Sequence, residues 1–219
     1  VLKRNVLKFK ADIGFAFDGD ADRIVAVDRF GNILDGDKIL YILAKYYKLQ
    51  NEDLKNVVGT SHTNMGIENA LNNLDINLIR ADVGDKYVLN EMLKQNCLIG
   101  GEQSGHIINL KYATTGDGIL TAVILSKILK EQGDLTKFFD VKMLPQVNIN
   151  VLTTDKLRVI NSEILSNTIY AEQENLKNGR IMVRASGTEP KIRIMVECGS
   201  LVQAQNTANR IADVVKRIS

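Results

Sequence analysis

The sequence has few cysteines and few histidines, and this shortage narrows the chemistry that the protein can perform. Its 219 residues include two histidines and two cysteines, Cys97 and Cys198. These residues do not form a zinc-binding pattern. Each cysteine stands in an apolar, strand-like stretch, which predicts two buried free thiols and argues against a disulfide or a redox role.

Long apolar runs and an excess of one charge are also absent. No run approaches the roughly 18 residues that a membrane-spanning helix needs. The start of the chain does not resemble a signal peptide, so a cytoplasmic location is expected. The net charge of +2 is too small to indicate nucleic acid or an anionic membrane as a partner. The hydrophobic share of 45% is typical of a globular protein.

Alternating strand-like and helix-like stretches occupy the first two thirds of the chain. Strands are predicted at 12–17, 24–28, 56–60, 76–80 and 97–100, and helices at 37–49, 66–73, 86–95 and 117–130. This succession predicts an α/β layer with a mostly parallel sheet. The chain starts at Val1, and residues 1–10 resemble the end of a helix, so we expect a piece of a longer protein.

The pattern changes near Pro145. Strands are predicted at 146–151, 180–184 and 191–197, and helices at 163–176 and 201–218. A polar turn joins the last two strands. These features predict a small α+β domain with helices on an antiparallel sheet, separated from the first domain near residues 142–146.

An acidic run, DGDADR at residues 18–23, directly follows an apolar strand. Its carboxylates stand at alternate positions and can converge on one cation if the backbone turns at Gly19. Hard oxygen ligands suit Mg²⁺, which keeps room for water and a substrate phosphate that Arg23 could also face. The predicted metal ligands are Asp18, Asp20 and Asp22.

Other interpretations of this run are weaker. A solvated acidic turn is the simplest, and a calcium EF-hand lacks the glutamate required at its twelfth position. A phosphatase of the haloacid-dehalogenase type would use an aspartate after a strand as its nucleophile, with a second aspartate two residues later. That family has Thr or Val where Asp22 stands, so the metal loop is favoured.

A glycine-rich run, GGEQSGH at residues 100–106, follows a predicted strand. Paired glycines allow a ligand to approach the backbone closely. Glu102 can accept hydrogen bonds from two neighbouring sugar hydroxyls, and Ser104 can add a third contact. His106 could shuttle a proton or bind phosphate. The alternative is a glycine-rich turn with a hydrogen-bonded, structural histidine.

The run RASGTEPKIR at residues 184–193 connects the last two predicted strands. Backbone N–H groups around Gly187 can form an anion-binding nest, and the flanking arginines can make bidentate contacts to phosphate. The predicted phosphate ligands are Arg184, Ser186, Gly187, Thr188 and Arg193. A plain hairpin turn would not need arginines on both sides.

In this order, the three loops resemble the α-D-phosphohexomutase family, and the resemblance covers essentially the whole chain. It implies a four-domain enzyme with three related α/β domains and a last domain of the TATA-binding-protein-like type. Residues 1–34 would finish the second domain with the metal loop. Residues 35–143 would form the third, a three-layer α/β domain with a mixed sheet and the sugar-binding loop. Residues 144–219 would form the small α+β domain with the phosphate-binding loop.

The resemblance also implies a mechanism. A phosphoserine in the first domain, coordinated to Mg²⁺, would give its phosphoryl group to the sugar. A sugar bisphosphate would be both intermediate and activator. The small domain would hold the phosphate that is not reacting, and Glu102 and Ser104 would bind the 3- and 4-hydroxyls in both sugar orientations. Without the phosphoserine domain, the chain alone is expected to be inactive.

Gln103 and the run VGDKYV at 83–88 resemble the branch that interconverts glucosamine 6-phosphate and glucosamine 1-phosphate, a step toward amino-sugar nucleotides and peptidoglycan precursors. Further substrate contacts implied there are Gly84 and Asp85. The candidates for general acid or base are Arg23, Lys86 and His106. That branch more often carries Arg where Lys86 stands, and the two residues are not equivalent donors.

Several alternatives remain open from the sequence. A glucose- or mannose-phosphate mutase of the same family is the nearest, and a dehalogenase-type phosphatase or a non-catalytic sugar-phosphate-binding module belongs to another class. A phosphosugar is the expected partner, and the protein could form a homodimer. The run TSHTN at 60–64 resembles the sequence around the family's phosphoserine. It follows the metal loop instead of preceding it, so Ser61 is expected to line the cleft at a strand end.

Overall fold

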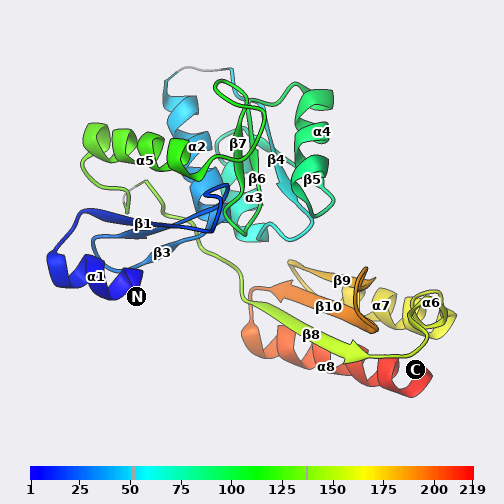
Figure 1. Ribbon diagram of the computed structural model, residues 1–219. Helices are drawn as coiled ribbons and strands as arrows, with labels where there is room; N and C mark the ends of the chain where they lie inside the picture. Colours follow the sequence, from blue (N-terminus) through cyan, green and yellow to red (C-terminus); the bar gives the residue numbers. More distant parts are fainter. Residues whose placement is uncertain (51–52, 137) are drawn as a thin grey trace. The chain divides into compact units, whose positions relative to one another are not determined.

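The computed structural model describes residues 1–50, 53–136 and 138–219, which divide into a first unit, residues 1–142, and a second unit, residues 143–219 (Figure 1). All the stretches predicted as helices or strands form, with ends shifted by no more than two residues. The elements that no pattern predicted are short: β3 (Ile33–Leu34), β7 (Ile107–Asn109) and α6 (Lys156–Ile160).

The first sheet of the first unit is an antiparallel meander that carries the acidic run at a turn. After α1 (Leu2–Phe9), β1 (Ile13–Phe17) pairs antiparallel with β2 (Ile24–Asp28), and β3 pairs with the other side of β2. Phe17 lies opposite Ile24, so residues 18–23 close a hairpin. The prediction of one mostly parallel layer is wrong for these strands, because the parallel pairing starts only at β4.

The second sheet is mixed, with the order β5-β4-β6-β7. Its parallel strands are β4 (Asn56–Thr60), β5 (Asn77–Ala81) and β6 (Ile99–Gly101), and β7 pairs antiparallel with β6. The helices of this layer are α2 (Gly36–Leu49), α3 (Met65–Asn72), α4 (Asp85–Gln95) and α5 (Gly118–Gln132). Val88 and Met92 of α4 pack with Val58 on one face. Figure 1 shows α2 on the other side of the sheet. Because helices cover both faces of this sheet, its strands are rich in apolar residues.

Polar side chains cap the N-termini of two helices that start next to the acidic and glycine-rich runs. Asp35 accepts a hydrogen bond from the Lys38 backbone N–H at 3.1 Å, at the start of α2. Asp117 accepts from the Leu120 N–H at 2.8 Å, at the start of α5. Such N-caps satisfy helix N–H groups and typically contribute about 1 kcal/mol each. They fix where α2 and α5 begin, and both starts lie against the loops described below.

The second unit is a three-stranded antiparallel sheet with helices. Its strands are β8 (Gln146–Leu152), β9 (Gly179–Ala185) and β10 (Lys191–Cys198), in the order β8-β10-β9, and its longer helices are α7 (Glu163–Asn175) and α8 (Leu201–Ile218). Along β8 the side chains of Val147, Ile149 and Val151 face the core, whereas the intervening residues are more exposed. This alternation is typical of a sheet that is covered on one face, as predicted.

The two cysteines are buried and free, as predicted. Burial raises the pKa of the Cys97 thiol, with a smaller contribution from the charge of Glu91, which makes the reactive thiolate scarcer at neutral pH. Within the ranges given above, no helix is long and apolar enough to cross a membrane.

Candidate functional site

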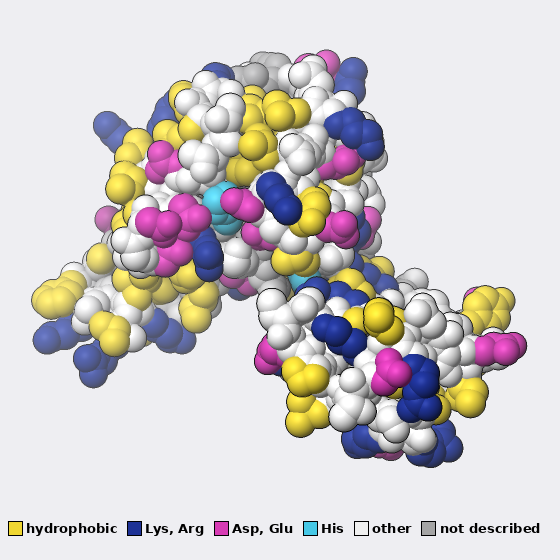
Figure 2. Space-filling view, turned by 45° about the vertical axis from the view of Figure 1, so that its right-hand side comes forward, with side chains coloured by type: hydrophobic (Ala, Val, Ile, Leu, Met, Phe, Trp, Pro, Cys, Tyr) yellow, Lys and Arg dark blue, Asp and Glu magenta, His cyan; other side chains and the backbone are white. Residues whose placement is uncertain are grey.

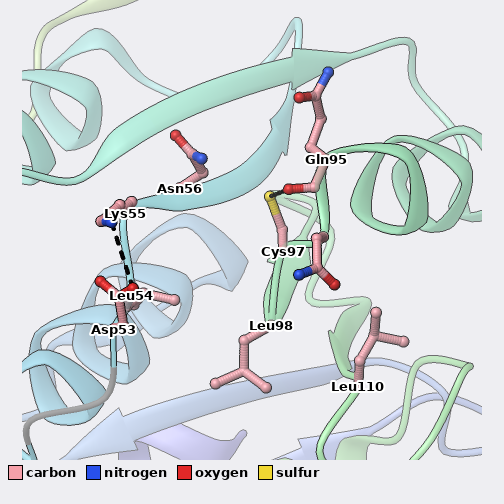
Figure 3. A pocket seen from close by; sticks show the side chains of 9 residues that line it. Asp53, Leu54, Lys55, Asn56, Gln95, Cys97, Leu98 and Leu110 are labelled. Carbon is pink, nitrogen blue, oxygen red and sulfur yellow. Dashed lines mark hydrogen bonds and ion pairs between the residues drawn. The ribbon is translucent and has the colours of Figure 1, made fainter.

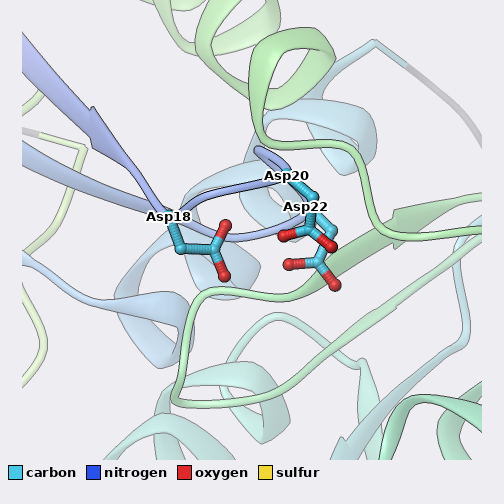
Figure 4. Close-up of side chains that lie close together, drawn as sticks. All are labelled: Asp18, Asp20 and Asp22. Carbon is cyan, nitrogen blue, oxygen red and sulfur yellow. The ribbon is translucent and has the colours of Figure 1, made fainter.

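The acidic run brings three carboxylates together. One oxygen from each of Asp18, Asp20 and Asp22 lies within 4.8 Å of the others. Figure 4 shows the carboxylate of Asp18 pointing toward those of the other two. The convergence that the alternate spacing predicts is therefore present, in a hairpin between two strands.

The backbone turns at Gly19 and Asp20, as predicted, and Ala21 follows this turn in an unusual conformation. Ala21 has a φ of +59°, whereas Gly19 is not among the residues with positive φ, and a Cβ added there would meet nothing within 4 Å. Two hydrogen bonds hold Ala21 in this unusual conformation. Its N–H donates to the Asp18 carbonyl (3.3 Å), and its carbonyl accepts from the Gly118 N–H at the start of α5 (2.9 Å).

The loop fits a magnesium ion. The Arg23 Nε lies 3.4 Å from Asp18 Oδ2 and 3.5 Å from Asp22 Oδ1, so one guanidinium offsets part of the charge of three carboxylates. Asp22 Oδ1 is nevertheless a buried oxygen without a hydrogen-bond partner, which is rare in folded proteins and calls for a ligand. The donors are all carboxylate oxygens on a partly exposed loop, the type of ligand that Mg²⁺ prefers.

His106 lies behind this loop. Its Nδ1 is 3.1 Å from Asp22 Oδ2, and its Nε2 accepts a hydrogen bond from the Gly116 N–H at 3.1 Å. Its residue surface is only 4% exposed. Both ring nitrogens are therefore engaged inside the protein, although His106 also lines the hollow described next, and its role as a proton shuttle or phosphate ligand stays a prediction.

A hollow of about 470 Å³ opens at the carboxyl ends of the parallel strands. It is lined by residues at or after the ends of β4, β5 and β6, together with part of the metal loop: Thr60, His62, Val83, Gly84, Asp85, Glu102, Gln103, Ser104, His106, Asp22 and Arg23. Ligands of α/β proteins bind at this edge of the sheet. Figure 2 shows acidic side chains gathered around a histidine on the surface of the first unit.

The glycine-rich run is a tight turn that is pressed against its neighbours. The Gly105 N–H donates to the Glu102 carbonyl (2.9 Å), and the Ile24 N–H donates to the Gly105 carbonyl (3.1 Å). Gly105 has a φ of +97°, and an added Cβ would overlap the Ile24 carbonyl oxygen. A Cβ at Gly36, the first residue of α2, would overlap the Glu102 carbonyl oxygen. Both glycines are therefore required by close approach of backbones.

The structure brings together two runs that the sequence keeps apart. Glu102 Oε1 accepts a hydrogen bond from the Gly84 N–H at 2.8 Å, and Gly84 is the N-cap residue of α4, with a φ of +130°. Gly84, Asp85, Glu102 and Ser104, the predicted substrate contacts of the first unit, all line the hollow. Their contact with a substrate stays a prediction.

Two residues singled out from the sequence lie elsewhere. The Lys86 ammonium stands over the Tyr87 ring, 4.8 Å from its centroid, and neither Lys86 nor Ser61 is among the lining residues. A catalytic role for Lys86 stays a prediction, and Ser61, which was expected to line the cleft, does not line this hollow. Thr60 and His62 do line it, and their position at the end of β4 is the signal that would have identified them.

A second hollow, of about 510 Å³, lies at the opposite edge of the same sheet (Figure 3). It is lined by residues that precede or begin β4 and β6, including Asn56, Cys97 and Leu98, and by an ion pair of 3.4 Å between Lys55 and Asp53. Amino ends of parallel strands are not the usual ligand-binding edge. The hollow beside the metal loop is therefore the better candidate site.

In the second unit, Arg184 and Arg193 lie directly opposite each other on β9 and β10. Like charges at such positions destabilise a sheet, so an anion that binds both would relieve the repulsion. Arg193 Nε is buried and has no hydrogen-bond partner, whereas its Nη2 donates to Ser186 Oγ at 3.4 Å. This arrangement suits a phosphate.

The loop between these strands is held in place and has an open side. The Lys156 Nζ donates to the Ser186 carbonyl at 2.6 Å, a support from α6 that the sequence did not reveal. Gly187 and Thr188 are exposed, and a Cβ added at Gly187 would meet nothing within 4 Å. A ligand can therefore reach this part of the loop.

Glu189 occupies some of the donors that a phosphate would use. Its carboxylate lies 2.8 Å from both the Lys191 Nζ and the Arg193 Nη2. The hydrogen bond from Lys191, with the charges of Lys191 and Arg193, lowers the pKa of Glu189. The carboxylate is therefore ionised at neutral pH and competes with an incoming phosphate.

We expect the variant Glu189→Gln to bind inorganic phosphate more tightly, by about two- to fivefold, because a competing exposed ion pair has only a small effect. Isothermal titration calorimetry measures the affinity. Glu174→Gln, an exposed residue of α7, makes the same change of net charge away from the loop and serves as the control. Equal affinities of the two variants would show that Glu189 does not compete.

Two models of one protein family match most of the chain. The model of phosphoglucomutase/phosphomannomutase, alpha/beta/alpha domain III, matches residues 35–143, and the model of the C-terminal domain matches residues 147–214. The chain belongs to the phosphoglucomutase/phosphomannomutase family. The resemblance of the three loops to the phosphohexomutases is thereby confirmed.

Curated relatives in this family are similar over nearly the whole chain. The phosphoglucosamine mutase of Shouchella clausii is 48% identical over 98% of this chain and 49% of the relative. The phosphoglucosamine mutase of Brevibacillus brevis is 46% identical over 99% of this chain and 49% of the relative. The chain thus spans about half the length of the curated relatives it matches.

Solved structures share the fold of this family member. The N-acetylphosphoglucosamine mutase of Aspergillus fumigatus, in complex with GlcNAc-6P and magnesium, has a TM-score of 0.79 at 23% identity, over 92% of this chain and 51% of that one. A phosphoglucomutase/phosphomannomutase family protein from Burkholderia thailandensis has a TM-score of 0.79 at 19% identity, over 97% of this chain and 49% of that one. At these identities the likeness concerns the fold alone.

Proposed function

We propose that these residues form part of a phosphoglucosamine mutase, an isomerase that interconverts glucosamine 6-phosphate and glucosamine 1-phosphate. The observation that carries the proposal is the group of three carboxylates within 4.8 Å of one another, next to the hollow at the carboxyl ends of the strands. Relatives named phosphoglucosamine mutase, 42–48% identical, support the amino sugar as substrate.

Each loop has a separate task in this proposal. Asp18, Asp20 and Asp22 would hold a magnesium ion, which neutralises charge on a phosphoryl group in transfer. Arg23 stands beside these carboxylates and would face the same phosphate. Glu102 and Ser104 would bind sugar hydroxyls. The phosphate that is not reacting would bind to Arg184, Ser186, Gly187, Thr188 and Arg193.

The proposed domain layout follows these loops. Residues 1–34 complete one domain with the metal loop, residues 35–143 form the sugar-binding domain, and residues 144–219 form the phosphate-binding domain. The family models, which match residues 35–143 and 147–214, support the last two assignments. A cytoplasmic location and a homodimer complete the proposal.

The proposed reaction exchanges one phosphate ester for another. The phosphorus–oxygen bond to a phosphoserine of the whole enzyme breaks as one to a sugar hydroxyl forms, which gives a sugar bisphosphate. After the bisphosphate turns round, its other phosphate returns to the serine. Ser61 is not among the residues that line the hollow, so we expect no turnover from the 219 residues alone. Turnover that Ser61→Ala abolishes would contradict this.

A coupled assay of the full-length polypeptide with Mg²⁺ and a trace of sugar bisphosphate tests the proposal. We expect a kcat/KM for glucosamine 6-phosphate well above that for glucose 6-phosphate. Equal or reversed values would keep the family and the metal loop but assign a phosphoglucomutase or phosphomannomutase. Release of free phosphate with an acyl-phosphate on Asp18 would indicate a dehalogenase-type phosphatase, and ligand binding without turnover would indicate a binding module.

A further inference from the structure

The proposed phosphate loop, residues 186–190, lies against the segment that follows β8. This segment leads into α6 (Figure 1), whose first residue is Lys156. The Thr153 N–H donates to the Pro190 carbonyl at 3.0 Å. The Lys156 Nζ donates to the carbonyls of Ser186, at 2.6 Å, and of Gly187, at 3.5 Å. Both ends of the loop are therefore supported by a segment that precedes it by 30 positions or more.

The hydrogen bonds from Lys156 fix the direction of two peptide groups. In a planar trans peptide, the N–H points away from the carbonyl of the preceding residue, and none of the described peptide bonds is cis. The Gly187 N–H therefore points away from the ammonium that holds the Ser186 carbonyl. The Thr188 N–H points away from the Gly187 carbonyl in the same way. Among the residues that the structure describes, no acceptor binds either N–H, so both are available to an anion.

These two donors lie on the accessible side of the loop. Gly187 and Thr188 are exposed, whereas Ser186 is buried and its N–H donates to the Lys191 carbonyl at 2.9 Å, which closes the hairpin. An ammonium that binds a carbonyl also polarises the peptide group, and the N–H of that group becomes a stronger donor. Lys156 therefore acts on the loop from the side opposite to an incoming phosphate.

We propose that Lys156 is a positioning residue of the phosphate loop, which holds two loop carbonyls so that the N–H groups of Gly187 and Thr188 face the phosphate that is not reacting. Its ammonium is directed to the carbonyls and does not contact the phosphate. The inference rests on the proposed function of this loop. It gives a task in substrate binding to α6, a helix of five residues outside the three loops that the sequence singled out.

This role predicts a particular kinetic effect. The phosphate that is not reacting keeps its charge and its bonds while the other phosphoryl group is transferred. Contacts to it therefore stabilise the bound substrate and the transition state equally. Loss of such contacts raises KM and leaves kcat nearly unchanged.

The variant Lys156→Met, made in the full-length polypeptide, removes the ammonium and keeps a good helix former. We expect it to bind inorganic phosphate about 3- to 20-fold more weakly in isothermal titration calorimetry. The KM for glucosamine 6-phosphate should rise by a similar factor, with kcat within about threefold of wild type at saturating sugar bisphosphate. Lys156→Arg, whose guanidinium can also donate to carbonyls, should bind phosphate within about threefold of wild type.

The control and the salt dependence separate orientation of the carbonyls from simple attraction by charge. Lys177→Met makes the same change of net charge at an exposed position of the same unit. Raising the salt concentration from about 0.05 to about 0.5 M screens exposed charges, so an effect of charge alone would disappear. We expect the ratio of the wild-type and Lys156→Met affinities to stay within about twofold. A ratio that falls to one, or an equal loss of affinity in Lys177→Met, would overturn the assignment.

Thermal unfolding without ligand shows whether each variant is folded, and Lys156→Gln replaces Lys156→Met if the latter does not fold. A lysine that only supports the hairpin would lower the unfolding temperature when replaced and leave the phosphate affinity of the folded variant unchanged. That result would also overturn the proposal. A wild-type protein that binds no inorganic phosphate would instead refute the phosphate loop of the proposed function, and the inference with it.

Discussion

Gly105→Ala is expected to destabilise the first unit by roughly 3–5 kcal/mol, among the largest effects that one added methyl group can have. Two causes act together at this position. A φ of +97° is strained for any residue with a Cβ, at a typical cost of 1–3 kcal/mol. The new Cβ also overlaps the Ile24 carbonyl oxygen, and overpacking typically costs a further 1–3 kcal/mol.

The other glycines of the first unit separate these causes. Gly36→Ala has the overlap, with the Glu102 carbonyl oxygen, but no positive φ. Gly133→Ala has a φ of +76° and open space, and Gly19→Ala has open space and no positive φ. We expect a loss of roughly 1–3 kcal/mol for Gly36→Ala, about 1 kcal/mol for Gly133→Ala, and a change within about 0.5 kcal/mol for Gly19→Ala.

Urea unfolding followed by circular dichroism gives the four free energies of unfolding. Equal losses for Gly105→Ala and Gly133→Ala would mean that the turn relaxes away from Ile24, so that only the backbone conformation matters. The same relaxation would move Glu102 and Ser104, because both belong to this turn. A raised KM for the sugar phosphate should therefore accompany the loss of stability at position 105, and not at position 133.

The sequence predicts the local features of this site well, because strand ends and loops have short-range signatures. Aspartates at alternate positions after an apolar strand are enough to predict that Asp18, Asp20 and Asp22 converge. The glycines of the run 100–106 likewise predict a tight turn. The positive φ of Ala21 has no such signature, however. Ala21 takes its positive φ because Gly118, almost a hundred residues later, donates to its carbonyl.

The contacts that turn these loops into a site are long-range, and no local pattern contains them. Asp22 and His106 are separated by 84 positions, and Gly84 and Glu102 by 18. The sequence alone does not reveal that both ring nitrogens of His106 have partners in the fold. Lys86 shows the same limit, because only the fold reveals that its ammonium lies over an aromatic ring instead of in the hollow.

Asp20→Asn is expected to abolish most of the proposed mutase turnover of the full-length polypeptide and to leave the metal-free protein slightly more stable. Asp18 pairs with Arg23, and Asp22 with both Arg23 and His106. Within the part of the chain that the structure describes, Asp20 has no hydrogen bond or ion pair, yet its carboxylate lies within 4.8 Å of the other two. Its charge is therefore repelled in the absence of a cation. Removing it should raise the free energy of unfolding by a few tenths of a kcal/mol.

In the presence of the metal ion, the same substitution is expected to be unfavourable. Loss of one of the three proposed ligands should weaken Mn²⁺ binding by roughly 100-fold or more, since loss of a supporting group typically costs about 10- to 100-fold. Charge neutralisation by a metal is worth several kcal/mol in a transition state, so kcat at ordinary Mg²⁺ should fall by about 10²- to 10³-fold. Thermal unfolding with and without Mg²⁺ measures both the stability of the metal-free protein and the stabilisation by the ion. Wild type is expected to gain stability from the ion, and the variant is not.

Asp75→Asn is the matched control, because it makes the same change of charge in the same unit at an exposed turn with a φ of +54°, which Asn also tolerates. It should keep the wild-type response to Mg²⁺. A residue retained for folding would make the metal-free protein less stable when it is replaced, whereas a residue retained for a ligand makes it more stable. A loss of metal-free stability in Asp20→Asn, together with an intact response to Mg²⁺, would therefore assign the acidic loop to folding and remove the central support of the proposed phosphoryl transfer.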